Sequence, residues 1–242
     1  MGDKLVLFDC DGVLINTEEV GYRIFNEMLE QEGISYTREE FVELLSGITY
    51  SQFLENLRRT YLERKGKELP ADFEKELSRR LTEAEDTEMK LIDGVKDLIA
   101  NLKKHNIPFA VCSNSGAEKL IRKLKKVGLY DDFAPYIFSR NHVENPKPAP
   151  DMYLHAAQLM GVKPRDCFVV EDSVTGTMAG AAAGATVIGF IGETHRNSNE
   201  GDYLRRAGAK LVAVGMPQVW QHIEKAYVMR PDSPSPSRDF RP

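Results

Sequence analysis

The sequence predicts an α/β protein in which a parallel sheet carries an inserted, all-helical segment. Three observations lead to this fold class. From Lys90 to about Tyr227, short apolar runs alternate with single helical patterns. The apolar runs do not alternate with polar residues, which is typical of strands buried on both faces. Residues 15–88, in contrast, contain helical patterns only.

Six apolar runs are the expected strands of this sheet, at residues 5–9, 109–115, 136–139, 167–173, 186–190 and 210–214. Helical patterns follow or separate them at residues 94–106, 117–128, 150–161, 175–185 and 216–227. Gly128 is the expected stop of its helix, and Pro150 is the expected start of the next. Since single helices connect the strands, we expect parallel pairing and a Rossmann-like core covered on both faces.

The helical segment interrupts this core directly after the first strand. We therefore expect a discontinuous catalytic core of residues 1–14 and 89–228, and a helical cap of residues 15–88 with helices at about 16–32, 38–47, 50–66 and 70–86. Charge supports the division, because the cap has 10 Lys and Arg against 18 Asp and Glu, a net charge of −8, while the rest has +3. Residues 229–242 are rich in Pro and Ser, and we expect a disordered tail there.

The overall composition excludes several classes of protein. The net charge of the 242 residues is −5, so we expect no nucleic-acid partner. No apolar run is long enough to cross a bilayer, so we expect no membrane partner. The three cysteines are odd in number and have no CxxC spacing, which predicts neither a disulfide framework nor a zinc site. We expect a monomer in the reducing cytoplasm.

Acidic side chains follow two of the expected strands at the point where each strand ends. Asp9 and Asp11 follow the first strand, and Glu171 and Asp172 end the fourth. The carboxyl ends of parallel strands form the ligand-binding edge of such a sheet. Converging carboxylates repel one another and need a cation, and Mg²⁺ prefers such oxygen ligands. We expect side-chain ligands from Asp9, Asp172 and Glu171, and the backbone carbonyl from Asp11.

The same edge has the groups that phosphoryl transfer needs. A carboxylate such as Asp9 can attack phosphorus and form an aspartyl-phosphate. Asp11 points the same way along the strand and can act as general acid and base. Ser113 and the amides near Asn114 can hold phosphoryl oxygens, and Lys147 supplies positive charge.

Four segments, DCDGVL, CSNS, NPKPAPD and VVEDSVTG, resemble the motifs of the haloacid dehalogenase superfamily in the same order. The resemblance covers about residues 4–228, and the helical insert is similar to that of the cap-bearing subgroup. That subgroup includes enzymes like phosphoglycolate phosphatase, β-phosphoglucomutase and phosphogluconate phosphatase. The resemblance implies a nucleophile at Asp9, a general acid/base at Asp11, a phosphate-binding Ser113, a charge-stabilising Lys147, and metal anchors at Asp172 and Glu171.

We therefore expect a Mg²⁺-dependent phosphatase of a small phosphorylated metabolite, either a sugar phosphate or a phosphorylated small acid. A phosphosugar mutase is the alternative, but Gly21 and Tyr50 stand where the β-phosphoglucomutase pattern has a histidine and an arginine. A dehalogenase needs no Mg²⁺ and no acid at Asp11. A non-catalytic phosphoaspartate switch lacks a helical insert and an acid two residues past the nucleophile.

Three surface segments complete the expectations. The cap loop offers Thr49 and Tyr50 as specificity contacts, better suited to a polyol or sugar than to a second phosphate. The hinges of the whole cap are expected near Leu14–Asn16 and Glu88–Leu91. The basic run 119–126 is interpreted as a solvated helix face, and residues 194–201 as a mobile surface loop.

Overall fold

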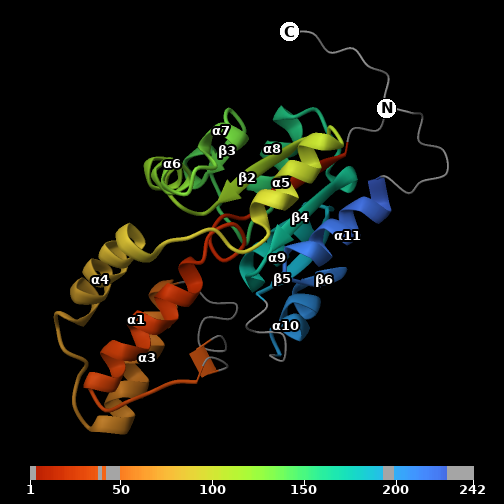
Figure 1. Cartoon of the computed structure of the whole chain (residues 1–242). Coiled ribbons are helices and arrows are strands. Elements are labelled where there is room, and N and C mark those ends of the chain that lie inside the picture. The colour runs from red at the N-terminus through yellow and green to blue at the C-terminus, as the bar shows by residue number, and fades with distance from the viewer. Residues whose placement is uncertain (1–3, 38–39, 42–49, 193–198, 228–242) are drawn as a thin grey trace.

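The structure is a computed structural model of the chain, and it describes residues 4–37, 40–41, 50–192 and 199–227 (Figure 1). Thr49 and the expected tail at 229–242 lie outside the described residues, as does most of the expected helix at 38–47. No described helix is both long and apolar enough to span a bilayer.

A parallel sheet forms the centre of the described chain and confirms the predicted fold class. Its six strands lie in the order β3-β2-β1-β4-β5-β6. They are β1 (Leu5–Phe8), β2 (Phe109–Ser113), β3 (Ile137–Ser139), β4 (Cys167–Glu171), β5 (Thr186–Ile191) and β6 (Leu211–Val214). The first strand therefore lies inside the sheet, between β2 and β4, with Phe8 in register with Val111 and Val170.

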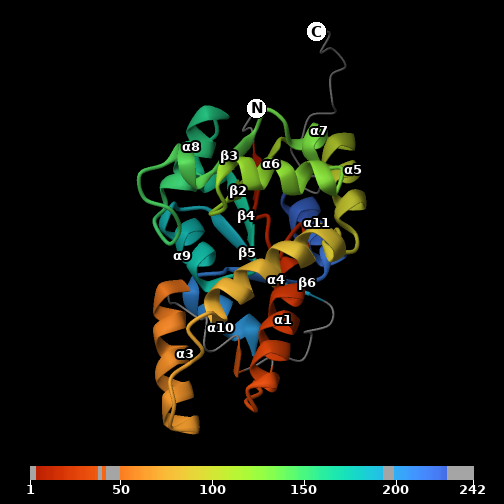
Figure 2. The same ribbon diagram turned by 90° about the vertical axis from the view of Figure 1, so that its left-hand side faces the viewer.

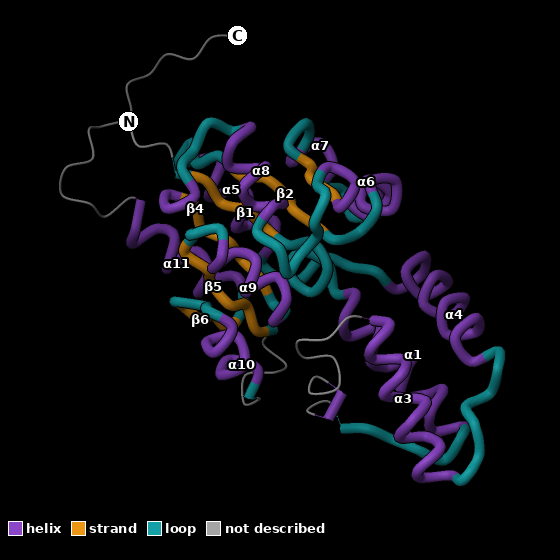
Figure 3. The backbone as a smooth tube through the Cα atoms, turned by 180° about the vertical axis from the view of Figure 1, so that it is seen from behind, coloured by secondary structure: helices purple, strands orange, loops and turns teal. Residues whose placement is uncertain are grey.

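Helices cover both faces of the sheet (Figure 3). One hydrophobic core lies between the sheet and α5 (Val95–Lys104), α6 (Ala117–Lys126), α7 (Tyr130–Phe133) and α11 (Met216–Tyr227). A second core lies between the sheet and α8 (Asp151–Leu159), α9 (Val174–Ala182) and α10 (Glu200–Ala207). Short 3₁₀ helices span Arg140–His142 and Pro164–Asp166.

The residues of β1 explain why this strand has no polar alternation. Val6 and Phe8 belong to the first core, and Leu5 and Leu7 to the second. All four are fully buried. Because both faces of the strand are covered by apolar cores, a polar side chain is expected only beyond its carboxyl end. That is the position of Asp9.

The cap helices form a third, separate core. They are α1 (Thr17–Gln31), α3 (Tyr50–Lys65) and α4 (Phe73–Glu88), and they lie together to one side of the sheet in Figure 1 and in front of it in Figure 2. The cluster of buried residues that joins them runs from Val20 to Ala84 and includes the fully buried Leu29, Leu57 and Tyr61. The division of the chain into a core of residues 1–14 and 89–228 and a cap of residues 15–88 stays a prediction.

The two linkers between cap and core run side by side. The Asn16 amide donates to the Lys90 carbonyl at 3.1 Å, and the Asn16 side chain accepts from the Lys90 amide at 2.7 Å. One step further, the Ile92 amide donates to the Leu14 carbonyl at 3.0 Å. These are the segments expected to be hinges, and they are bonded to each other.

Two helices differ from the sequence-based prediction. The short α7 had no predicted counterpart, and α10 begins at Glu200, so the loop predicted at 194–201 is wrong for Glu200 and Gly201. Only Gly201 and Leu204 are buried in α10, where Leu204 packs in the second core and Gly201 lies close to Ile191 of β5. Half of its eight residues are charged, so this short segment resembles an exposed loop in the sequence.

Gly180 of α9 provides a test of helix-to-sheet packing. A Cβ there would lie 2.9 Å from Val187 Cγ2 and 3.0 Å from Val169 Cγ1, whereas a Cβ on Gly21 of α1 would meet nothing within 4 Å. Both glycines are helical, so alanine brings both the same gain in helix propensity, about 0.5–1 kcal/mol. We expect Gly21→Ala to raise the free energy of unfolding by about that amount. Gly180→Ala should lower it by about 1–2 kcal/mol, since overpacking costs about 1–3 kcal/mol. Urea denaturation measures both, and equal stability of the two variants would contradict the packing interpretation.

Candidate active site

The predicted site lies at the carboxyl ends of three neighbouring strands of the sheet. Asp9 directly follows β1, Ser113 ends β2, and Glu171 ends β4. The Asp9 amide still donates to the Val170 carbonyl at 3.0 Å, which fixes the start of the loop against β4. Gly12 then has a φ of +79°, a conformation that favours glycine, and the chain turns sharply there.

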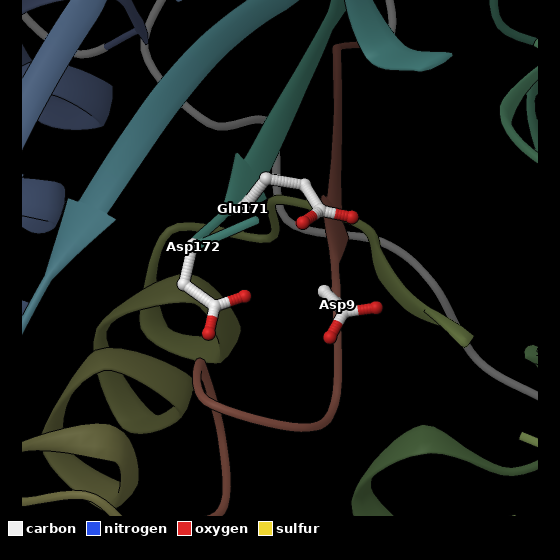
Figure 4. A group of neighbouring side chains, drawn as sticks. All are labelled: Asp9, Glu171 and Asp172. Carbon is white, nitrogen blue, oxygen red and sulfur yellow. The ribbon is translucent and has the colours of Figure 1, made fainter. Parts of the chain in front are cut away.

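Three carboxyl groups converge at this edge. Asp9, Glu171 and Asp172 each place one oxygen within 4.8 Å of the others. Figure 4 shows Asp172 and Asp9 side by side below Glu171, with the carboxylate of Asp172 pointing toward Asp9. A donor set made only of carboxylate oxygens suits a hard divalent cation. The sequence prediction that these acids meet is confirmed.

Lys147 lies between two of these acids. Its buried ammonium donates to Asp9 Oδ1 at 2.5 Å, to Glu171 Oε1 at 2.6 Å and to the Cys112 carbonyl at 2.8 Å. Burial alone would lower the pKa of the Lys147 ammonium, but the carboxylates of Asp9 and Glu171 outweigh it and raise that pKa. Lys147 is therefore held as a cation inside the site.

The electrostatic environment of Asp9 differs from that of an ordinary surface acid. Burial raises the pKa of the Asp9 carboxyl to about 7, and Glu171 and Asp11 add to this effect. The Lys147 ammonium opposes the increase. A positive charge placed at the site would stabilise the carboxylate form further.

Both carboxylate oxygens of Glu171 accept hydrogen bonds from neighbouring side chains. Oε1 accepts hydrogen bonds from Lys147 and from the Tyr153 hydroxyl, the latter at 2.6 Å, and Oε2 accepts from the Ser173 hydroxyl at 3.0 Å. A Cβ on Gly176 would lie 1.9 Å from Oε1, so α9 approaches the carboxylate where only glycine fits. Tyr153 was not predicted, because it lies in an apolar helix face without a motif.

Asp11 is bonded to three different parts of the chain. Oδ1 accepts from the Thr17 hydroxyl at 2.7 Å and from the Lys123 ammonium at 2.5 Å, and Oδ2 accepts from the Ser115 hydroxyl at 3.1 Å. Burial alone would raise the pKa of Asp11, but Lys123 and these hydrogen bonds lower it. Thr17 is the first residue of α1, so the cap touches Asp11 directly.

Lys123 corrects the interpretation of residues 119–126 as a solvated face. Its side chain is 4% exposed and contacts Asp11. Leu120 and Leu124 lie on the same buried face of α6. Leu120 lies three positions before Lys123 and Leu124 directly after it, so the helical periodicity of the sequence places Lys123 on the buried face.

Ser113 and Asn114 lie at the site in different ways. Ser113 is buried, and its hydroxyl accepts from the Ser115 amide at 3.1 Å. The Asn114 side chain donates to the Lys147 carbonyl and accepts from the Lys147 amide, both at 3.0 Å. Asn114 therefore fixes the backbone on both sides of Lys147, a contact that the sequence did not indicate.

The predicted specificity residues of the cap are not placed by the structure. Thr49 lies outside the described residues, and Tyr50 begins α3 but has no described side chain. Their role stays a prediction.

The Tyr153 hydroxyl offers a test of the support around Glu171. Tyr153→Phe removes a buried hydrogen bond to a carboxylate and changes nothing else in shape. We expect the free energy of unfolding to fall by about 1.5–3 kcal/mol, the usual contribution of a hydrogen bond to a charged group. Tyr136→Phe is the matched control, because Tyr136 is 43% exposed, and it should change stability by about 0.5 kcal/mol or less. Urea denaturation measures the free energy of unfolding of both variants. Equal losses of stability would refute a stabilising hydrogen bond from Tyr153 to Glu171.

Comparison with known proteins agrees with the geometry. The family model described as haloacid dehalogenase-like hydrolase matches residues 6–190. Hexitol phosphatase A from Escherichia coli is 32% identical over 189 residues, which are 76% of this chain and 82% of that protein. The 6-phosphogluconate phosphatase from Escherichia coli is 28% identical over 193 residues, 79% of this chain and 84% of that protein.

A longer relative contains the match as one part. The bifunctional riboflavin kinase/FMN phosphatase from Arabidopsis thaliana is 34% identical over 186 residues, which are 76% of this chain but only 47% of that protein. The chain thus spans about half the length of this relative.

Solved structures show the same arrangement over nearly the whole chain. A haloacid dehalogenase-like protein from Agrobacterium tumefaciens has a TM-score of 0.82 and 34% identity, and the match covers 93% of this chain and 99% of that one. A HAD family hydrolase from Deinococcus radiodurans, with bound phosphate and sodium, has a TM-score of 0.81 and 30% identity, covering 93% and 96%. The chain belongs to the haloacid dehalogenase-like hydrolase family, and its relatives include enzymes that are named as phosphatases.

Proposed function

We propose that this enzyme is a Mg²⁺-dependent phosphomonoester hydrolase that forms an aspartyl-phosphate on Asp9. Its substrate is a small phosphorylated metabolite, either a sugar phosphate or a phosphorylated small acid. One observation carries the proposal: the Asp9 carboxylate lies within 4.8 Å of the acids Glu171 and Asp172 and 2.5 Å from the ammonium of Lys147. A nucleophile, a cation and a metal-binding set therefore meet at one point.

The metal ligands we propose are the side chains of Asp9 and Asp172 and the backbone carbonyl of Asp11. Glu171 lies within reach, but its oxygens already accept from Lys147, Tyr153 and Ser173, so it supports the site mainly as the counter-ion of Lys147. Mg²⁺, when bound, offsets the negative charge of the transferring phosphoryl group. The donor set contains carboxylate and carbonyl oxygens only, which fits a hard cation.

In the first step, an oxygen of Asp9 attacks phosphorus. The new bond joins that oxygen to phosphorus as the ester P–O bond breaks. The leaving oxygen takes a proton from Asp11, which enters this step protonated, although Lys123 favours its carboxylate form before substrate binds. Lys147 keeps Asp9 oriented by its contact with Oδ1 and adds positive charge beside the phosphoryl oxygens. Ser113 and the amides near Asn114 are the proposed contacts of those oxygens.

In the second step, water releases the phosphate. Asp11, now a carboxylate, takes a proton from water as the water oxygen bonds to phosphorus and the bond between Asp9 and phosphorus breaks. Inorganic phosphate leaves and Asp11 is again protonated. The proton that Asp11 gave in the first step is thus returned in the second.

Relatives support the substrate class. Two of them are named for 6-phosphogluconate and hexitol phosphates, and the Deinococcus radiodurans neighbour has phosphate bound. In this chain, the cap loop with Thr49 and Tyr50 is the proposed contact with the hydroxyl groups of such a substrate. A cap that closes over the substrate would also exclude water from the site.

The remaining expectations stay part of the proposal. We propose a core of residues 1–14 and 89–228 with a cap of residues 15–88, which the separate cap cluster supports. We also propose a cytoplasmic monomer without a nucleic-acid or membrane partner. The cysteines Cys10, Cys112 and Cys167 are free and buried, which suits a reducing compartment.

Replacement of the nucleophile tests the proposed function. We expect the enzyme to release phosphate from p-nitrophenyl phosphate and from at least one member of a panel of sugar phosphates and phosphorylated acids. Asp9→Asn keeps the shape of the side chain but removes the nucleophilic charge, and it should lower kcat by about 10³-fold or more. Asp97→Asn, an exposed acid of α5, is the control and should leave kcat unchanged. Full activity of Asp9→Asn would refute the mechanism.

Metal removal tests the proposed cofactor. EDTA should abolish phosphate release, and added Mg²⁺ should restore it, because the carboxylates repel one another without a cation. Asp172→Asn removes one ligand charge and should raise the Mg²⁺ concentration for half-maximal activity by about tenfold or more. Isothermal calorimetry of Mg²⁺ binding gives a second readout. Activity that persists in EDTA would rule out a dependence on divalent metal.

A further inference from the structure

The site contains a second buried lysine that lies outside all four sequence motifs. Lys123 is on the second turn of α6, and its side chain is 4% exposed. Its neighbours on the same face, Leu120 and Leu124, are fully buried in the hydrophobic core. An aliphatic side chain at this position would fill the space as well, so packing alone does not explain a lysine here.

The contact made by Lys123 is with Asp11. The ammonium lies 2.5 Å from Oδ1, and the same carboxylate accepts from Thr17 and Ser115. The three donors come from α6, from the first residue of the cap helix α1, and from the loop after β2. Bonds from three directions define one orientation of a carboxylate that is otherwise free to rotate about two bonds.

The two lysines of the site serve different acids. Lys147 contacts Asp9 and Glu171, while Lys123 contacts Asp11. A buried ammonium is costly unless it is paired, and each of these lysines is paired with the acid that performs one proposed task. Asp9 is the proposed nucleophile, and Asp11 is the proposed group that moves the proton.

We propose that Lys123 is a positioning residue that holds the Asp11 carboxyl group where it exchanges protons with the leaving oxygen and with water. This inference rests on the proposed function. Lys123 itself gives up no proton and touches no phosphoryl oxygen. The proton passes from Asp11 to the leaving oxygen in the first step and from water to Asp11 in the second.

With p-nitrophenyl phosphate as substrate, a positioning role of Lys123 and a purely structural role predict different kinetics. Its phenolate leaves without a proton, so the first step does not depend on Asp11, whereas hydrolysis of the aspartyl-phosphate does. Stopped-flow measurement in Mg²⁺ records both, as a burst of p-nitrophenolate and a steady-state rate. For Lys123→Met, we expect a burst rate within about threefold of wild type. The steady-state rate should fall about 10- to 100-fold, part of the 10²–10⁴-fold that acid–base catalysis contributes.

Three further variants complete the experiment. Lys125→Met, an exposed lysine of the same helix, should leave both rates unchanged. Lys123→Arg keeps the charge and should recover part of the steady-state rate. In the Asp11→Asn background, Lys123→Met should cause no further decrease, because the residue through which Lys123 acts is already gone. Circular-dichroism melting checks that each variant is folded, and Lys123→Gln replaces Lys123→Met if the latter is not.

Several outcomes would overturn the inference. A parallel fall of burst and steady-state rates would indicate a structural role, and an unchanged kcat with a raised KM would indicate substrate binding instead. An equal decrease in the Asp11→Asn background would show that Lys123 does not act through Asp11. Failure of the proposed function looks different: the wild-type enzyme would not turn over p-nitrophenyl phosphate, and both proposals would then fall.

Discussion

The ammonium of Lys147 holds together the ends of three neighbouring strands. It bonds to Asp9 after β1, to Glu171 at the end of β4 and to the Cys112 carbonyl of β2. A buried cation and two buried carboxylates would each be costly alone, and together they offset much of that cost. The centre of the sheet and the chemistry at its edge therefore depend on the same contact.

The neighbours of this contact limit its movement from several sides. Asn114 bonds to the backbone on both sides of Lys147, and Tyr153 and Ser173 bond to Glu171. These residues contribute no charge, but they fix the charged groups in one arrangement. Pre-organised groups of this kind need little rearrangement when charge develops in a reaction, which is a major source of enzymatic rate enhancement.

Sequence patterns were sufficient for the sheet and for the acids at its edge, because apolar runs and strand ends are local features. Asp9, Lys147 and Glu171 were predicted to meet, and they do. Lys123 was misinterpreted, since a buried lysine is rare and its partner Asp11 lies 112 residues away. Tyr153 and the clamp formed by Asn114 depend on how distant segments pack, which no local pattern records. The helix α10 was missed because it is short and half of its residues are charged.

The paired linkers at Asn16 and Lys90 have a consequence for how such enzymes diversify. The chain leaves the sheet and returns to it at adjacent points. The cap is therefore an insertion within a single loop of the core. Its length and sequence can change without altering the strand order or the register that places the acids. Recombination at the paired linkers would replace one cap by another and give the same catalytic residues a new range of substrates. Substrate selectivity can therefore evolve in the cap while the chemistry of the core is kept.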